Sequence, residues 1–243
     1  MHIIKVNAID STNSFLRNWN REKYLTTPVC VVAKEQLTGK GQMGTTWQSN
    51  ANENLTCSVF MPINSIEVMD QFYISIAVSL AVYDTLNSLI LPKLSIKWPN
   101  DILSDRYKVC GILIENILNS GRLRGVIIGI GINVNQLEFD NLPFAGSIKQ
   151  LTGKNFDIDE VLQVLLSKLK NRFSELSQEN FDVLKEEYES LLFRKDKPST
   201  FVDVKGDSFV GIIKKVSNSG KLQILLEDEV IGDFDLKEIK LLY

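Results

Sequence analysis

The chain has 243 residues, of which 27 are lysine or arginine and 30 are aspartate or glutamate, giving a formal net charge of −3. Hydrophobic residues make up 44% of it, which is typical of a globular protein with a sizeable core. The length favours one large domain plus a small one. The slightly acidic balance argues against nonspecific binding to nucleic acid, although a local basic pocket remains compatible with it.

Histidine and cysteine usage narrows the chemistry. His2 is the only histidine, which argues against a Cys/His zinc cluster and against a histidine-based triad. The cysteines, Cys30, Cys57 and Cys110, each sit in an apolar run, as buried reduced thiols do, and this points to the cytoplasm. No apolar run reaches the roughly 18 residues of a membrane span, and no signal peptide is evident at the N-terminus.

The first half of the chain mixes strand and helix patterns. The segment 10-DSTN-13 supplies N-cap side chains for a helix, and apolar residues at spacings of three and four predict a long second helix. The expected elements are, in chain order, a strand at 2–9, a helix after residue 11, strands at 28–36 and 54–62, and a helix at about 67–89.

The second half begins with strands at 93–98, 108–117 and 122–135. The turn 119-NSG-121 predicts a hairpin, so the sheet is expected to contain antiparallel pairs. Asp157 and Glu160 suggest a capping box for a helix, and a further helix is expected at about 179–192. The apolar face of the first of these helices is formed by Leu162, Leu165, Leu166, Leu169 and Phe173. After 194-RKDKPST-200 the pattern changes to short alternating strands, which we interpret as a small β-barrel.

A glycine loop, 38-TGKGQMGTTWQ-48, contains the spelling G-x-G-x-x-G. A dinucleotide-binding fingerprint must open a helix, but here turn-forming residues and then another strand follow. A P-loop also fails, because Thr45 and Thr46 stand where Gly-Lys-Ser/Thr would continue. The context instead favours a loop that covers an anionic ligand with backbone amides and places Trp47 on a flat base. A surface loop with an incidental tryptophan is the alternative.

Three further motifs follow in order. The segment 97-KWPND-101 ends a strand in a rigid turn that exposes an amide and a carboxylate. In 108-KVCGILIE-115 a lysine opens a strand, and in 129-GIGINVN-135 glycines lie within one. A glycine inside a strand often marks the close approach of a ligand or of another backbone. Each motif alone is weak.

Together with 11-STN-13 and 36-QLTGKGQMGTTW-47, these motifs resemble those of the biotin protein ligases. The similarity extends from residue 1 to about 180. It implies an α+β catalytic domain related to class II aminoacyl-tRNA synthetases, with a mixed, largely antiparallel sheet, at 1–193. An SH3-like barrel is implied at 194–243. The helix-turn-helix that represses transcription in some members has no room before residue 1, so no DNA partner is expected.

The resemblance implies ATP-dependent attachment of biotin to a lysine of a biotin carboxyl carrier domain, through biotinyl-5′-AMP and with Mg²⁺. Lys108 and Asp101 match catalytic positions: Lys108 would contact the biotin carboxylate and the α-phosphate, and Asp101 would orient the incoming lysine. The implied biotin-binding residues are Ser11, Thr12, Asn13, Gln36, Gly39, Lys40, Gly41, Lys108, Gly111, Gly129 and Gly131. The implied ATP- and adenylate-binding residues are Lys40, Gln42, Trp47, Asn100, Lys108 and Asn133. No residue is assigned to a metal.

The glycine loop departs from the family. Where the family usually places three arginines, this chain has Lys40, Gln42 and Thr45, so the loop carries less positive charge. A lipoate–protein ligase of the same fold and a non-catalytic biotin or nucleotide sensor remain as alternatives. The expected partner is a carrier domain docked at an edge strand of the sheet, and the protein is expected to be a monomer or a homodimer.

Overall fold

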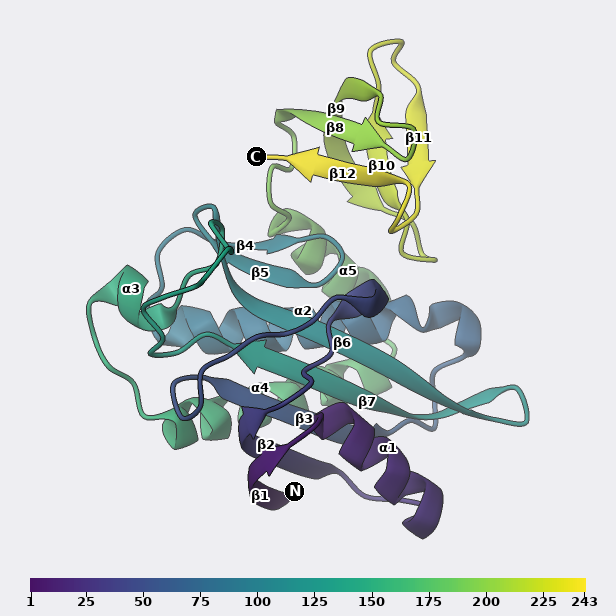
Figure 1. Ribbon diagram of the computed structural model, residues 1–243. Coiled ribbons are helices and arrows are strands. Elements are labelled where there is room, and N and C mark those ends of the chain that lie inside the picture. Colours follow the sequence, from purple (N-terminus) through teal and green to yellow (C-terminus); the bar gives the residue numbers. More distant parts are fainter.

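The computed structural model describes residues 1–243 apart from the side chain of Met43 (Figure 1). It contains a seven-stranded sheet with helices on both faces and a five-stranded sheet built by the end of the chain. The fold is therefore α+β with a mixed sheet, as predicted. No helix in the described part of the chain is long and apolar enough to cross a membrane.

The seven-stranded sheet has the order β1-β2-β3-β7-β6-β5-β4. β1 and β2 pair in parallel, and every other neighbouring pair is antiparallel. Its strands are β1 (His2–Ile9), β2 (Val29–Gln36), β3 (Leu55–Pro62), β4 (Leu94–Lys97), β5 (Asp101–Ser104), β6 (Tyr107–Asn119) and β7 (Arg122–Ile132). β5, which is four residues long, pairs only with the beginning of β6, up to Gly111, and β4, which is equally short, pairs with β5.

The main core lies between this sheet and the helices α2 (Phe72–Ser88), α4 (Ile158–Ser177) and α5 (Phe181–Ser190). α2 is apolar around most of its circumference because it contacts the sheet as well as α4 and α5. α4 is amphipathic, and its predicted apolar face is buried as expected. Arg172 on α4 joins the three helices through Asp84 on α2 at 2.9 Å and Glu187 on α5 at 2.6 Å.

The opposite face of the sheet carries only α1 (Thr12–Lys23). The Ser11 side chain caps this helix by accepting a hydrogen bond from the Ser14 amide, as the N-cap pattern predicts. Leu16 packs on Val31, Phe60 and Ile127 in a smaller core on that face. Since α1 packs mainly on β2, β3 and β7, the part of this face around β5 and the start of β6 stays accessible.

The C-terminal sheet (β8–β12) has the strand order β11-β10-β9-β8-β12 and lies beside the β4–β5 end of the large sheet (Figure 1). Its strands are β8 (Pro198–Asp203), β9 (Ser208–Val216), β10 (Leu222–Leu225), β11 (Ile231–Phe234) and β12 (Ile239–Leu242). A turn of this sheet contacts the KWPND motif, since the Trp98 indole donates to the Gly220 carbonyl at 2.9 Å. A side chain at Gly220 would lie 2.4 Å from the Phe72 ring, so glycine is required there.

Several predicted boundaries differ from the structure. The long helix expected at 67–89 begins with a separate 3₁₀ turn, η2 (Val68–Asp70), which tightens the entry to α2. β7 ends at Ile132, so 133–135 leave the strand. Asp157 caps α4 through the amides of Asp159 and Glu160, whereas the capping box with both reciprocal bonds is at Ser147 and Gln150, at the start of α3 (Ile148–Thr152). Neither α3 nor β5 was predicted.

Candidate active site

One row of residues crosses the large sheet on the face that carries α1. Directly opposed positions run from Lys97 on β4 through Asp101 on β5, Gly111 on β6 and Gly131 on β7 to Thr56 on β3. Opposed residues in neighbouring strands present their side chains on the same face of a sheet. The two glycines therefore leave a hollow, with charged side chains on one side of it and a hydroxyl on the other.

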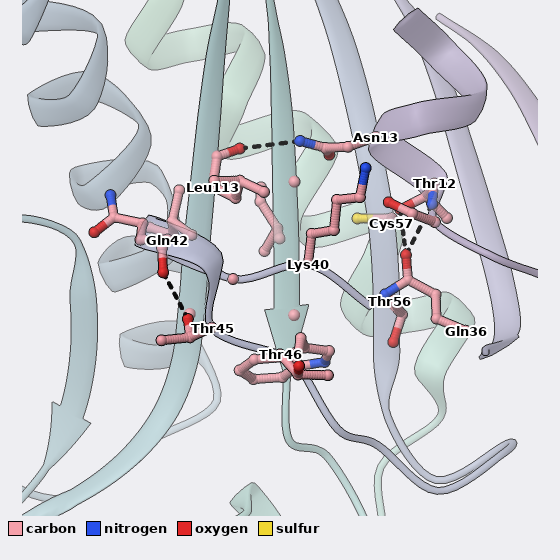
Figure 2. Close-up of a pocket in the computed structure, with 18 of the residues that line it drawn as sticks. Thr12, Asn13, Gln36, Lys40, Gln42, Thr45, Thr46, Thr56, Cys57 and Leu113 are labelled. Carbon is pink, nitrogen blue, oxygen red and sulfur yellow. Dashed lines mark hydrogen bonds between the residues drawn. The ribbon is translucent and has the colours of Figure 1, made fainter. Parts of the chain in front are cut away.

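A cavity of about 300 Å³ lies over this hollow (Figure 2). Its walls come from the start of α1, the end of β2, the glycine loop, and strands β3, β5, β6 and β7. The predicted site residues in its lining are Ser11, Thr12, Asn13, Gln36, Lys40, Gly41, Gln42, Trp47, Asp101, Lys108, Gly111, Gly129 and Gly131. The sequence motifs thus converge on one cavity. Three of the predicted site residues, Gly39, Asn100 and Asn133, are not in the described lining.

A polar wall closes the α1 end of the cavity. Gln36 Oε1 accepts hydrogen bonds from the Thr12 amide at 2.8 Å and the Thr12 hydroxyl at 3.0 Å (Figure 2). The buried Ser58 hydroxyl lies 2.7 Å from Thr12 Oγ1 and 2.5 Å from Asn13 Oδ1. The hydroxyls of Thr12 and Ser58 have one proton each, but three oxygen–oxygen contacts need a proton: Thr12 with Gln36, Ser58 with Thr12, and Ser58 with Asn13. The wall therefore has more acceptor oxygens than hydroxyl protons. Such a wall suits a ligand that brings N–H donors.

Glu115 anchors this wall from β6. Its carboxylate accepts from Asn13 Nδ2 at 2.9 Å and pairs with the Arg17 guanidinium of α1. Asn13 is therefore held between Glu115 and Ser58, and a side chain at Gly129 would lie 2.4 Å from Asn13 Oδ1. Gly129 therefore permits the close approach of the Asn13 side chain. The sequence had suggested that the group approaching Gly129 would be a ligand.

Lys108 and Asp101 form the charged end of the cavity. Lys108 Nζ lies 2.7 Å from Asp101 Oδ1, and both side chains keep partial exposure, at 37% and 23%. The register between β5 and β6 shifts between Ile102 and Leu103, because Val109 of β6, next to Lys108, has no opposed residue on β5. An ammonium that is paired on one side and open to the cavity on the other can bind an incoming anion.

The Lys108 backbone is held by a segment that continues the sheet where β7 ends. The Lys108 amide donates to the Phe144 carbonyl at 2.6 Å, and the Gly146 amide donates to the Lys108 carbonyl at 3.0 Å. The buried Asn133 side chain donates to the Gly146 carbonyl at 3.0 Å, and Asn100 donates to the Ile112 carbonyl at 2.7 Å. Both asparagines thus bond to the backbone of the strands around the cavity.

The glycine loop is a short hairpin that contains one 3₁₀ turn, η1 (Gln42–Gly44). The Gly41 amide donates to the Thr45 carbonyl at 2.7 Å, and the Trp47 amide donates to the Gly39 carbonyl at 3.0 Å. Lys40 extends over the cavity toward α1 and donates to the Ser14 hydroxyl at 3.0 Å (Figure 2). A strand precedes and follows this loop, so the rejection of a dinucleotide fingerprint is confirmed.

The Trp47 ring lies over the paired glycines of β6 and β7. A side chain built on Gly131 would lie 2.3 Å from the ring, and one on Gly111 would lie 2.9 Å from it. The indole N–H is buried without a hydrogen-bond partner among the described residues. These glycines therefore accommodate Trp47 itself, where the sequence-based interpretation expected a ligand. A buried N–H with no partner is a donor that a ligand could satisfy.

The cysteine beside the cavity is not an activated nucleophile. Cys57 lines the cavity, and its hydrogen bond with Cys30 together with burial raises the pKa of its thiol well above the usual value. Burial likewise raises the pKa of Cys110. Since the thiolate is the reactive form, these residues stay protonated at neutral pH. All three cysteines are buried free thiols, as predicted.

Sequence reasoning missed Ser58 and Glu115 as parts of the polar wall. Their signal was present in the alternation of polar residues, since Thr56 and Ser58 are two apart on β3 and face the cavity side together. Glu115 closes the motif 108-KVCGILIE-115, but only the strand pairing brings it to Asn13. These are contacts across the sheet, which local patterns do not specify.

Comparison with known proteins identifies relatives. Residues 6–133 match the family model described as the biotin/lipoate A/B protein ligase family. The bifunctional ligase/repressor BirA of Bacillus subtilis is 33% identical over 165 residues, which are 66% of this chain and 50% of that protein. The biotin–[acetyl-CoA-carboxylase] ligase of Paracoccus denitrificans is 28% identical over 204 residues, 79% of this chain and 82% of the relative. The chain spans about half the length of the two Bacillus relatives.

A solved structure agrees over nearly the whole chain. The biotin protein ligase from Aquifex aeolicus in complex with biotin and ATP superposes with a TM-score of 0.83 at 27% identity. The match covers 99% of this chain and 98% of that one, so both sheets of the present fold are included. The biotin protein ligase of Leishmania major in complex with biotinyl-5-AMP has a TM-score of 0.67 at 21% identity, and supports the fold alone.

Proposed function

The chain belongs to the biotin/lipoate A/B protein ligase family, and we propose that it attaches biotin to a lysine of a biotin carboxyl carrier protein at the expense of ATP. One arrangement carries this proposal: a single cavity has an acceptor-rich wall at one end and the Lys108–Asp101 pair at the other. A small acid with a polar head group and a carboxylate tail can satisfy both ends. The likeness to the Aquifex ligase bound to biotin and ATP supports the same assignment.

The head group of biotin is a cyclic urea, which carries N–H donors. Thr12, Asn13, Gln36 and Ser11 surround the wall where oxygen acceptors exceed hydroxyl protons. A ureido N–H directed at this wall would satisfy acceptors that otherwise compete for two protons. An acceptor left unpaired in such a site costs about 1–3 kcal/mol, so the wall would select for a ligand of this donor pattern.

In the first step, the biotin carboxylate attacks the α-phosphorus of ATP, a bond to the carboxylate oxygen forms, and pyrophosphate leaves. The two reactants are both anions, so catalysis requires positioning and positive charge. Lys108 can neutralise the attacking carboxylate and the phosphate oxygens that gain charge. No covalent enzyme intermediate is needed, which fits the protonated thiols of Cys57 and Cys110.

In the second step, the amine of the carrier lysine attacks the acyl carbon of biotinyl-5′-AMP, an amide forms, and AMP leaves. Asp101 lies beside the reacting end of the cavity and is already paired with Lys108 at 2.7 Å. We assign it the orientation of the incoming lysine side chain. The two roles are compatible, because a carboxylate can accept several hydrogen bonds.

The nucleotide would lie along the glycine loop. Lys40 and Gln42 line the cavity from that side, and the unpartnered indole N–H of Trp47 offers a donor next to a flat aromatic surface. Gly39 and Gly41 allow the two arms of the loop to lie close together, because side chains there would meet the Trp47 carbonyl and the Thr45 hydroxyl. Asn100 and Asn133 support the nucleotide side through the strand backbone that they bind. The loop supplies one cation where three arginines are usual, so we expect weaker retention of the adenylate.

Mg²⁺ would have to arrive with ATP. Among the described residues there is no group of three or more His, Cys, Asp or Glu side chains that could hold a metal ion. Asp101 is the one carboxylate in the described lining of the cavity, and it is paired with Lys108. We therefore propose that the ion's ligands are mainly phosphate oxygens and water.

We also propose that the chain divides into two domains. We assign a class II aminoacyl-tRNA synthetase-like catalytic domain to 1–193 and an SH3-like barrel to 194–243. The five antiparallel strands of the C-terminal sheet and the change of pattern after Arg194 support this division. The buried free thiols support a cytoplasmic location.

The carrier domain would dock at the edge of β6. β5 covers β6 only up to Gly111, so the stretch 113–119 has no strand neighbour on that side among the described residues. Unpaired backbone groups there can extend the sheet with a strand of the carrier. The same edge could pair two copies of the chain into a homodimer, the alternative to a monomer.

Biotin-dependent exchange of labelled pyrophosphate into ATP tests the proposal. We expect exchange with biotin, none with lipoate, and loss of exchange in Lys108→Ala. Lys93→Ala is the matched control, because Lys93 also pairs with an aspartate, at 3.2 Å from Asp105 just after β5, but lies outside the cavity. Absence of exchange by the folded protein would favour a non-catalytic sensor. Exchange with lipoate alone would favour a lipoate ligase.

A further inference from the structure

A residue of the C-terminal segment reaches the candidate site. The Tyr243 ring lies 5.5 Å from the Phe144 ring and 5.1 Å from the Phe193 ring, and the Lys97 ammonium lies 5.0 Å from its centroid. Tyr243 follows β12, whereas its three neighbours belong to or directly flank the large sheet. One aromatic side chain therefore bridges the two sheets.

Two of these contacts lead directly to the Lys108–Asp101 pair. Phe144 provides the carbonyl that accepts from the Lys108 amide at 2.6 Å, so a shift of Phe144 would move the backbone of Lys108. Lys97 is directly opposite Asp101 in the pairing of β4 with β5, and the two side chains face the same side of the sheet. Tyr243 thus contacts the neighbours of both members of the pair.

The surroundings of Lys97 disfavour the charged form of its side chain. Burial lowers the pKa of Lys97, Lys108 and Lys240 lower it further, and Asp101 opposes them. The face of an aromatic ring attracts an ammonium, and it does so most strongly where water is excluded. The Tyr243 ring therefore stabilises the charged form of Lys97 at the edge of the cavity.

The space around Lys97 is continuous with the site. A second cavity, of about 210 Å³, lies between the two sheets and is lined by Lys97, Lys240 and apolar residues. Gln42 and Asp101 line both this cavity and the larger one. The row of residues that crosses the hollow therefore extends beyond Asp101 to Lys97 and ends under the Tyr243 ring.

We propose that Tyr243 is a positioning residue for the active site, which holds Lys97 in place by its ring face and Lys108 in place through Phe144. The inference rests on the ligase activity proposed above. Lys108 lies at the end of the larger cavity opposite Thr12 and Gln36, and Lys97 lines the adjoining cavity. Loss of the ring should therefore disturb the end of the cavity that binds ATP and leave the wall that faces the biotin head group intact.

Three variants test this role in the full-length chain by biotin-dependent pyrophosphate exchange. Tyr243→Ala should raise the KM for ATP by about threefold to tenfold, in the range expected for one cation–π contact, with little change in the KM for biotin. Tyr243→Phe keeps the ring and should restore the wild-type KM for ATP. Leu242→Ala changes the exposed last residue of β12, next to Tyr243, and is the control that should match the wild type.

Reductive methylation of lysines provides a readout that does not depend on activity. Lys97 is partly buried under the ring, so its methylation should accelerate in Tyr243→Ala and stay slow in Tyr243→Phe and Leu242→Ala. Equal KM values for ATP in wild type and Tyr243→Ala would overturn the proposal. Parallel increases in both KM values, or failure of Tyr243→Phe to rescue, would assign Tyr243 a general structural role instead. A wild-type protein without exchange would refute the proposed function, whereas the methylation pattern would still report on the contact.

Discussion

The Trp47 ring and Gly131 should be tightly coupled. A methyl group on Gly131 would lie 2.3 Å from the ring, against at least 3.4 Å for an ordinary contact, so in Gly131→Ala the ring would have to recede by about 1.1 Å. Overpacking of this kind costs about 1–3 kcal/mol. Gly131 has no unusual backbone conformation, and alanine is favoured over glycine inside a strand by about 0.5–1 kcal/mol. Without the clash, the substitution should therefore be neutral or stabilising.

A double-mutant cycle measures this coupling. Urea unfolding of the wild type, Gly131→Ala, Trp47→Ala and the double variant gives four free energies of unfolding. Gly131→Ala should destabilise the protein by about 1–3 kcal/mol when Trp47 is present. In the Trp47→Ala background the same change should leave stability equal or raise it by up to about 1 kcal/mol. An equal loss in both backgrounds would refute the placement of the ring over the paired glycines.

Two further predictions concern charge. Gln42→Arg adds a cation to the cavity lining. It should slow dissociation of the adenylate by about tenfold to a hundredfold, which is the effect of one charge-assisted hydrogen bond. Equal dissociation rates in the variant and the wild type would contradict the view that the glycine loop holds the adenylate weakly for lack of charge. Arg172→Met should lower the free energy of unfolding by about 3 kcal/mol, because it leaves Asp84 and Glu187 without their shared partner, whereas Lys5→Met, which breaks the exposed pair with Asp159, should change it little. Urea unfolding of both variants measures the two losses, and similar losses would show that the ion pairs of Arg172 with Asp84 and Glu187 do not stabilise the packing of the three helices.

The sequence predicted most strands and the long helices, because β-branched runs and apolar spacing at three and four residues are local signals. The buried face of α4 is an example, and so is the rejection of a dinucleotide fingerprint from the strand that follows the glycine loop. β5 was missed because its four residues directly follow a Pro-Asn turn and are too few to show a period. α3 is one short turn of helix and was missed for the same reason.

Within the site, the converging motifs were predictable but their contacts were not. Lys108 and Asp101 were singled out from sequence, and the register of β5 and β6 brings them to 2.7 Å. Gly131 was singled out from sequence and lines the cavity, but the close approach of the Trp47 ring to it was not predicted. Tyr243 gave no sequence signal, since its contacts with Phe144 and Lys97 depend on how the C-terminal sheet lies against the large one.

Transfer of biotin to a purified carrier domain tests the proposed function most directly. The chain is incubated with ATP, Mg²⁺, biotin and a biotin carboxyl carrier domain, and the modified residue is identified by mass spectrometry. The account predicts biotin on a single lysine of the carrier, dependent on ATP and lost in Lys108→Ala. An unmodified carrier in the presence of folded wild-type protein, or equal modification by the Lys108→Ala variant, would contradict it.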